Sequence, residues 1–281
     1  MYYTAIVLAA GQGSRMNSKI RKQYMQIGGK PVLYYALRAF EDSFADEIIL
    51  VTAEEEIAFC KKEIVGKYAF QKVTKIVAGG AERYHSVYRG LCAARAEGCV
   101  LIHDGARPFL SKEILERARE TLHGHAACAA AVRAKDTVKI ADADGYVIET
   151  PDRASVWNMQ TPQCFTYELA MGAYRKLMAS VDALSGGGKK CGDASSGGQR
   201  ESAHAMSGEE QKSESLSLGG KTPDRGEPQA QPVKITDDAM VIEHFSSERV
   251  RLFEGAYGNI KITTPEDMIL AEAYLKRIQE K

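Results

Sequence analysis

The sequence predicts an α/β fold in three layers, with a mostly parallel sheet between helices. Apolar runs typical of buried strands lie near residues 4–9, 47–52, 73–77, 99–103 and 126–132. Helical patterns alternate with them, near residues 31–41, 54–68, 83–97 and 111–123. Right-handed crossovers in such a fold bring ligands to the carboxyl ends of the strands. We therefore expect the loops after Ala10, Val77 and His103 to form the functional site.

The composition limits the class of protein. The chain has 281 residues, 44% of them apolar, which suffices for the core of one domain spanning residues 1–281. Lysine plus arginine and aspartate plus glutamate both number 37, which argues against a nucleic-acid-coating protein or a membrane-surface binder. No basic stretch precedes the first apolar run, and no apolar run is long enough to span a membrane. We expect a cytoplasmic protein whose six scattered cysteines are free thiols.

The first strand leads into a glycine loop within AIVLAAGQGSRMNSKIRKQ, residues 5–23. Gly11 and Gly13 permit a tight turn in which successive N–H groups can point into one concavity and hold a phosphate chain. Arg15 and Lys22 follow, and such cations neutralise the charge that develops on a polyphosphate under attack. The alternative is a tight turn followed by a solvated basic surface.

A second glycine turn, AGGAERYHSVYRGL, spans residues 78–91 after the third predicted strand. Gly80 helps to end that strand, and Ser86 lies within the first two turns of the following helix. Backbone N–H groups and a hydroxyl at this place can meet a base or a phosphate. Arg83 and His85 fit a solvated helix face equally well.

The fourth strand ends in a carboxylate within VLIHDGARPF, residues 100–109. Asp104 is therefore expected at the carboxyl edge of the sheet, close to the glycine loop. There it can help to position Mg²⁺, which accepts few protein ligands and takes the rest from phosphate and water. A structural ion pair with Arg107, three residues further on, is the competing interpretation.

Beyond residue 132 the pattern changes to short β-like pieces. Residues 137–140 and 146–148 alternate around a turn at Asp144-Gly145, which predicts a hairpin within an arm of about residues 133–156. The hairpin has few apolar residues and needs a partner surface. We therefore expect it to be a dimerisation arm.

The C-terminal third contains an insertion followed by two helices. Residues 183–232 include ten glycines and eight serines with no aromatic, valine or isoleucine residue, so we expect disorder there. Thr236 resembles an N-cap of a helix running to Phe245. Thr264 and Pro265 predict the start of the last helix. Its expected packing face is formed by Leu270, Tyr274 and Ile278.

These motifs resemble one family. LAAGQGSRM followed by KQY resembles the opening of the sugar-phosphate nucleotidyltransferases. The order AAGxGxRM, KQY, GGxxRxxSV, HDxARP, DTxK, DR followed by W, TPQxF, TDD and NIKIT is similar to that of the 2-C-methyl-D-erythritol 4-phosphate cytidylyltransferases of the non-mevalonate isoprenoid pathway. The resemblance covers nearly the whole chain except residues 183–232. It implies a Rossmann-like nucleotidyltransferase fold and a homodimer with shared active sites.

The resemblance also implies a reaction and its residues. CTP would transfer its cytidylyl group to 2-C-methyl-D-erythritol 4-phosphate in the presence of Mg²⁺, releasing pyrophosphate. Arg15 and Lys22 would act at the α-phosphorus, and Arg153 and Lys261 would hold the methylerythritol phosphate. The implied substrate-binding residues are Ala9, Ala10, Gly11, Gly13, Gly80, Ser86, Asp104, Gly105, Arg107, Thr137, Thr161 and Thr236, with Asp104 also the metal ligand.

Two of these residues also fit a role unrelated to the substrate. On composition alone Arg153 fits a solvated charge, and Lys261, between Ile260 and Ile262, fits an outward-facing strand residue.

Three positions depart from the family pattern. Ala81 stands where an aspartate is common, so we expect one polar contact to be absent or replaced. Arg21 stands where a proline is usual before KQY, so we expect a less rigid approach of Lys22. Gly105 stands where alanine is common, with no obvious consequence.

Two other functions stay open. A ribitol 5-phosphate cytidylyltransferase shares the loop and the TPQ element, although Trp157 after Asp152-Arg153 argues against it. A catalytically silent α/β binding protein is the second, and the joint presence of Lys22, Asp104 and Lys261 with Arg15 argues against that.

Overall fold

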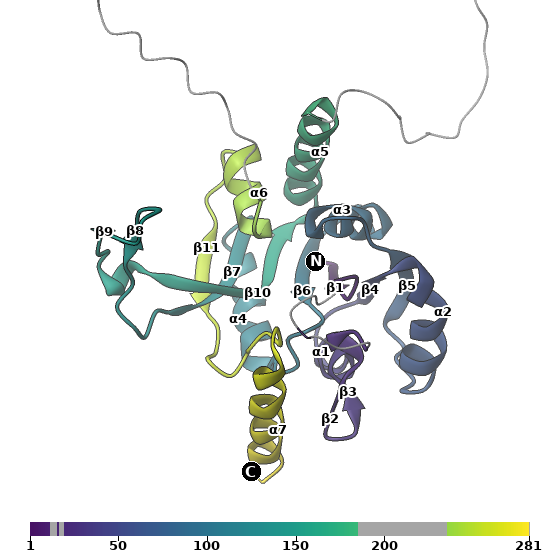
Figure 1. Cartoon of the computed structure of the whole chain (residues 1–281). Helices are drawn as coiled ribbons and strands as arrows, with labels where there is room; N and C mark the ends of the chain where they lie inside the picture. Colours follow the sequence, from purple (N-terminus) through teal and green to yellow (C-terminus); the bar gives the residue numbers. More distant parts are fainter. Residues whose placement is uncertain (12–15, 17–19, 185–234, 281) are drawn as a thin grey trace, which may run out of the picture.

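The computed structural model describes residues 1–11, 16, 20–184 and 235–280. Its centre is a seven-stranded sheet in the order β11-β7-β10-β6-β1-β4-β5 (Figure 1). Every strand is parallel to the others except β10, which runs antiparallel between β6 and β7. The strands are β1 (Tyr3–Leu8), β4 (Glu47–Thr52), β5 (Val73–Ala78), β6 (Cys99–Asp104), β7 (Ala127–Arg133), β10 (Trp157–Thr166) and β11 (Arg251–Glu254). The predicted mostly parallel α/β sheet is confirmed.

Helices cover both faces of this sheet and give the three layers (Figure 1). The α-helices are α1 (Val32–Glu41), α2 (Ile57–Phe59), α3 (Arg83–Ala93), α4 (Lys112–Leu122), α5 (Tyr167–Leu184), α6 (Asp238–Phe245) and α7 (Pro265–Gln279). A 3₁₀ turn, η3 (Glu54–Glu56), precedes α2, and a π-helical segment, η4 (Cys60–Gly66), follows it. A small hairpin of β2 (Gln26–Ile27) and β3 (Lys30–Pro31) packs near α7.

Alternation along the central strands builds a core on each face of the sheet. Ala5 and Val7 of β1 pack with α1 and α4 in one hydrophobic cluster. Ile6, between them, packs with α3, α5 and α6 in the other. Both faces are buried, and the middle of β1 (residues 5–8) and of β6 (residues 99–102) is accordingly a continuous apolar run.

The strand order places a switch point beside β1. The chain moves from β1 outward to β4 and β5, and then returns to add β6 on the other side of β1. Loops leaving the carboxyl ends of β1 and β6 diverge at such a point, which opens a crevice. The segments that follow these two strand ends are Ala9–Gly11 and the turn after Asp104.

Several predicted boundaries differ from the structure. Helix α3 ends at Ala93 rather than near residue 97, because Ala94 adopts an extended conformation. Residues 54–66 are helical as predicted but wind mostly as 3₁₀ and π turns. Strands β10 and β11 and helix α5 were not predicted. Helix α5 runs through residues 183 and 184, so the predicted insertion begins too early, and residues 185–232 lie outside the described chain.

The predicted hairpin is present but shorter than expected. Strands β8 (Ile140–Ala141) and β9 (Val147–Glu149) pair around Gly145, whose φ of 88° suits a glycine. The arm projects away from the sheet (Figure 1), and Tyr146, Val147 and Ile148 on it are 58–74% exposed.

Two details of the C-terminal helices are corrected. The N-cap of α6 is Asp237, whose carboxylate accepts from the Met240 amide, and not Thr236. The N-terminus of α7 has the expected Thr264 cap and Pro265. The packing face predicted for α7 was wrong at Leu270 and Ile278, which are 45% and 54% exposed, whereas Tyr274 is half-buried against Phe109. The buried side chains of this helix include Ala271 and Leu275.

The five cysteines in the described residues are free thiols, as expected, and Cys191 lies outside that part of the chain. None of the helices in the described ranges has the length and apolar character to cross a membrane.

Candidate active site

A cavity of about 270 Å³ opens at the switch point between β1 and β6. The predicted meeting of three loops is confirmed, since residues after β1, β5 and β6 all line it. The cavity residues are Leu8, Ala9, Ala10, Gly11, Lys22, Gln23, Gly80, Ala81, Glu82, Arg83, Ser86, Asp104, Ala106 and Lys261. Of the predicted site residues, this set contains Ala9, Ala10, Gly11, Lys22, Gly80, Ser86, Asp104 and Lys261. Gly13 and Arg15 lie outside the described residues.

Gln23 anchors the first loop to the turn that carries Lys22. Its buried side-chain amide donates to the carbonyls of Ala9, at 2.5 Å, and Gly11, at 3.2 Å. Lys22 itself belongs to a 3₁₀ turn, η2 (Lys22–Tyr24). The segment from Ala9 to Gly11 and the turn that carries the lysine are thus fixed to each other through the neighbouring glutamine.

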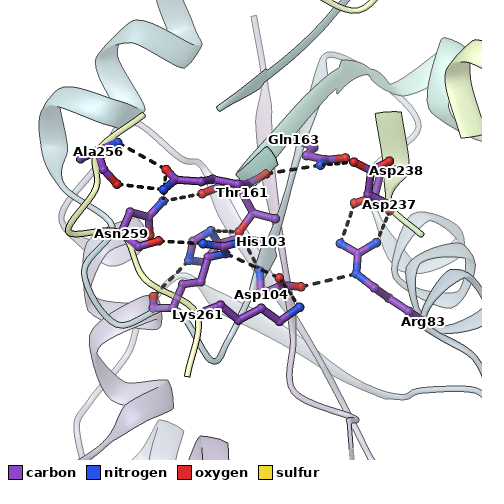
Figure 2. Close-up of polar contacts among 12 residues, drawn as sticks. Arg83, His103, Asp104, Thr161, Gln163, Asp237, Asp238, Ala256, Asn259 and Lys261 are labelled. Atoms are coloured by element: carbon purple, nitrogen blue, oxygen red, sulfur yellow. Dashed lines mark hydrogen bonds and ion pairs between the residues drawn. The ribbon is translucent and has the colours of Figure 1, made fainter. Parts of the chain in front are cut away.

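Three cationic side chains surround Asp104, two of which, Lys261 and Arg83, are labelled in Figure 2. The Lys261 ammonium lies 2.8 Å from Asp104 Oδ2, Arg83 Nε lies 3.4 Å from Oδ1, and Arg107 Nε lies 3.7 Å from Oδ2. The Asp104 side chain is only 11% exposed. Burial alone would raise its pKa, but Lys261, Arg83 and Arg107 hold it well below the usual range of a carboxyl. Asp104 therefore stays ionised throughout the physiological range.

Arg83 links this carboxylate to a second one. Its two terminal nitrogens each lie 2.7 Å from an oxygen of Asp238, at the start of α6, and Asp238 is fully buried. The Tyr174 hydroxyl also donates to Asp238, at 2.5 Å. A bidentate guanidinium–carboxylate pair fixes both planes. Sequence reasoning left Arg83 undecided and overlooked this partner; the only local signal was its place just after the Gly79-Gly80 strand end.

A buried hydrogen-bonded chain supports Asp104 from behind (Figure 2). The Asp104 amide donates to Thr161 Oγ1, at 3.2 Å, and that hydroxyl lies 2.8 Å from Nδ1 of His103. The other His103 nitrogen, Nε2, lies 3.3 Å from the Arg107 carbonyl. Burial lowers the pKa of His103 to about 4, so its ring is neutral and can donate from one nitrogen and accept at the other. The turn carrying Asp104 is therefore held by groups that carry no competing charge.

Ser86 ties the second glycine turn to its helix. Its hydroxyl accepts from the Gly80 amide, at 3.1 Å, and lies 3.4 Å from the Glu82 carbonyl. A Cβ at Gly80 would lie 2.4 Å from the Cβ of His85, so this close approach requires glycine. The turn presents both residues to the cavity.

Three predicted residues lie behind the cavity rather than on it. Thr161 is buried in the chain described above, and Arg107 donates to the Asn259 carbonyl at 2.7 Å. Gly105 packs against β1, and a Cβ there would lie 2.9 Å from the Leu8 carbonyl oxygen. An alanine at this position is therefore not innocuous, contrary to expectation.

The remaining three predicted residues lie away from the cavity of this chain and are exposed. Thr137 and Arg153 belong to the arm, where Arg153 donates to the Lys135 carbonyl at 3.2 Å. Thr236 precedes α6, and its hydroxyl lies 3.7 Å from Met240 Sδ.

Comparison with known proteins places this chain in a family. The sequence pattern of the 2-C-methyl-D-erythritol 4-phosphate cytidylyltransferase (IspD) family matches residues 3–189 and 221–277. The chain belongs to this family. A member from Lachnospira eligens is 43% identical over 97% of this chain and 99% of its own length. A member from Lachnoclostridium phytofermentans is 40% identical over 99% of this chain and 97% of its own length. Both carry the name 2-C-methyl-D-erythritol 4-phosphate cytidylyltransferase.

Solved structures of the family share the fold. The 4-diphosphocytidyl-2C-methyl-D-erythritol synthase of Anaerococcus prevotii superposes with a TM-score of 0.71 at 33% identity, covering 98% of this chain and 96% of its own. The 2-C-methyl-D-erythritol 4-phosphate cytidylyltransferase of Thermus thermophilus superposes with a TM-score of 0.62 at 23% identity, covering 96% of this chain and 98% of its own. At this identity it supports the fold alone. The cavity between β1 and β6 is thus a candidate active site of a cytidylyltransferase.

Proposed function

We propose that this chain transfers the cytidylyl group of CTP to 2-C-methyl-D-erythritol 4-phosphate, giving 4-diphosphocytidyl-2-C-methyl-D-erythritol and pyrophosphate. The observation that carries the proposal is the cavity at the β1/β6 switch point. It combines a glycine loop with Lys22 and with the Lys261–Asp104–Arg83 cluster. Family membership supports the same reaction.

The chemistry needs positioning and charge neutralisation more than proton transfer. A phosphate oxygen of the acceptor attacks the α-phosphorus of CTP, a new P–O bond forms, and the bond from the α-phosphorus to the bridging oxygen of pyrophosphate breaks. The acceptor phosphate is already an anionic nucleophile at neutral pH, so no general base is required. Lys22 and Arg15 neutralise the charge growing on the triphosphate, while Lys261 binds the acceptor phosphate.

Asp104 fits a divalent cation as a single protein ligand. The described residues contain no cluster of three or more His, Cys, Asp or Glu side chains. Of the two carboxylates lining the cavity, Glu82 caps α3, which leaves Asp104. Mg²⁺ binds through one or two carboxylates together with phosphates and water. Bound there, Mg²⁺ would supply charge neutralisation to the departing pyrophosphate.

We further propose a homodimer in which the arm completes the neighbour's site. Arg153 and Thr137 are exposed on the arm and lie outside the cavity of their own chain. The arm also exposes Tyr146, Val147 and Ile148, apolar side chains that a partner surface would cover. An arm crossing a two-fold axis would bring Arg153 to the partner's acceptor phosphate.

An acceptor panel tests the reaction. Pyrophosphate release is measured with CTP and Mg²⁺ plus methylerythritol phosphate, ribitol 5-phosphate or no acceptor. We expect at least about tenfold faster release with methylerythritol phosphate than with ribitol phosphate, a barrier difference of about 1.4 kcal/mol. Equal or faster release with ribitol phosphate favours that alternative, and no release with any acceptor favours the binding protein.

A further inference from the structure

The turn that carries Lys22 is clamped from outside the cavity by one carboxylate, that of Glu56 at the end of η3. Its Oε1 lies 3.0 Å from Nε of Arg21, the residue just before Lys22. Its Oε2 accepts from the hydroxyl of Tyr24, at 2.8 Å. The two oxygens of one side chain thus hold both ends of the three-residue turn η2.

The clamp is partly buried and has further partners. Arg21 also pairs with Glu55, and the Tyr24 hydroxyl lies 2.8 Å from Thr52 Oγ1, at the end of β4. Burial, with the neighbouring Cys60 thiol, raises the pKa of Tyr24, so its hydroxyl stays protonated and donates. The side chains of Arg21 and Glu56 are 22% and 17% exposed. Such a network restricts a turn more than a fully exposed pair does.

We infer that Glu56 is a positioning residue for the candidate catalytic Lys22, acting through Arg21 and Tyr24. On this inference, Arg21 would restrain the approach of Lys22 and not loosen it. The backbone of Arg21 has φ −63° and ψ 138°, values that proline also adopts. The ion pair between side chains holds the chain in the conformation that a pyrrolidine ring would fix covalently.

The bland alternative is a surface ion pair that contributes a little stability and nothing to the site. The positioning role and the surface ion pair predict different results for the same variants. A positioning role predicts that Arg21→Gly and Glu56→Ala lower kcat while the KM for CTP and the melting temperature change little. It also predicts that Arg21→Pro, which removes the charge but fixes φ, preserves kcat far better than Arg21→Gly does.

The experiment combines steady-state kinetics with hydrogen exchange of the Tyr24 and Met25 amides, which close the turn on the carbonyls of Arg21 and Lys22. For Arg21→Gly and Glu56→Ala we expect kcat to fall about fivefold or more and exchange to quicken by a similar factor. Arg21→Pro should exchange no faster than wild type. The matched control is Glu54→Gln, which removes a carboxylate charge from the same turn η3 at an exposed side chain.

Equal kcat and equal exchange in Glu56→Ala and Glu54→Gln would overturn the inference. So would an Arg21→Pro variant as slow as Arg21→Gly, because the charge itself would then matter. The inference rests on the proposed function for the role of Lys22. If wild type released no pyrophosphate, that function would fail, while the exchange rates would still decide whether Glu56 holds the turn.

Discussion

The sharing of active sites between subunits gives a quantitative test. Arg153→Ala removes a guanidinium from the arm, and Lys261→Ala removes the ammonium that lies 2.8 Å from Asp104 in the cavity. Each variant alone should be nearly inactive if both groups bind the acceptor phosphate. Mixed after subunit exchange, the two should recover activity, because a mixed dimer then holds one pocket with neither defect and one with both.

The size of the recovery follows from the arrangement. Random exchange of equal amounts makes about half of the dimers mixed, and half of their pockets are intact, so activity should approach about a quarter of wild type. The assay is pyrophosphate release, with native mass spectrometry of differently tagged subunits to measure exchange. If Arg153 worked in its own chain, every pocket would carry one defect and the mixture would stay inactive.

A matched control uses two residues of the same cavity. Asp104→Asn mixed with Lys261→Ala leaves one defect in every pocket of a mixed dimer, since both residues line one cavity of one chain. This mixture should remain inactive. Recovery there as well, or no recovery with Arg153→Ala despite complete exchange, would refute the shared site.

Three further predictions concern single residues. Lys22→Ala should lower kcat about a hundredfold, measured by pyrophosphate release against the exposed control Lys112→Ala; a change in KM alone would make Lys22 a substrate clamp. Asp267→Ala should lower the free energy of unfolding at pH 7 by about 1 kcal/mol, because the Asp267 carboxylate accepts from the Thr263 and Thr264 amides, at 2.7 and 2.9 Å. These amides outweigh burial and lower the pKa of Asp267, so this contribution is present above pH ~4 and is lost as pH falls through the folded-state pKa, which urea titrations at several pH values would detect. Gly105→Ala should lower the free energy of unfolding by about 1–3 kcal/mol, because its Cβ would lie 2.9 Å from a backbone oxygen, whereas Gly172→Ala, with open space around it, should not.

The glycine turns and the charged strand ends were predictable because each depends on local sequence. Gly11 and Gly80 follow apolar runs, and Asp104 ends one, so their shared edge follows from parallel crossovers alone. Lys261 was reached only through the family resemblance, since its alternation with Ile260 and Ile262 fits an outward-facing residue equally well. In the structure its ammonium forms an ion pair with Asp104, which lies 157 residues earlier in the chain.

What the sequence by itself determined was the alternation of apolar strands with helices up to about residue 132, because burial on both sheet faces imposes such patterns, whereas β10, α5 and β11 were not predicted. Only the tertiary structure decided the partners. Arg83 binds Asp238, 155 residues away, because α5 packs against both α3 and α6. Helix α7 buries Ala271 in the cluster containing Ile27 and Ile262, and it places Leu275 beside Gly28. Glu56 reaches Arg21 because β4 lies next to β1. No local pattern encodes such contacts, since each depends on where separate crossovers bring residues that are distant along the chain.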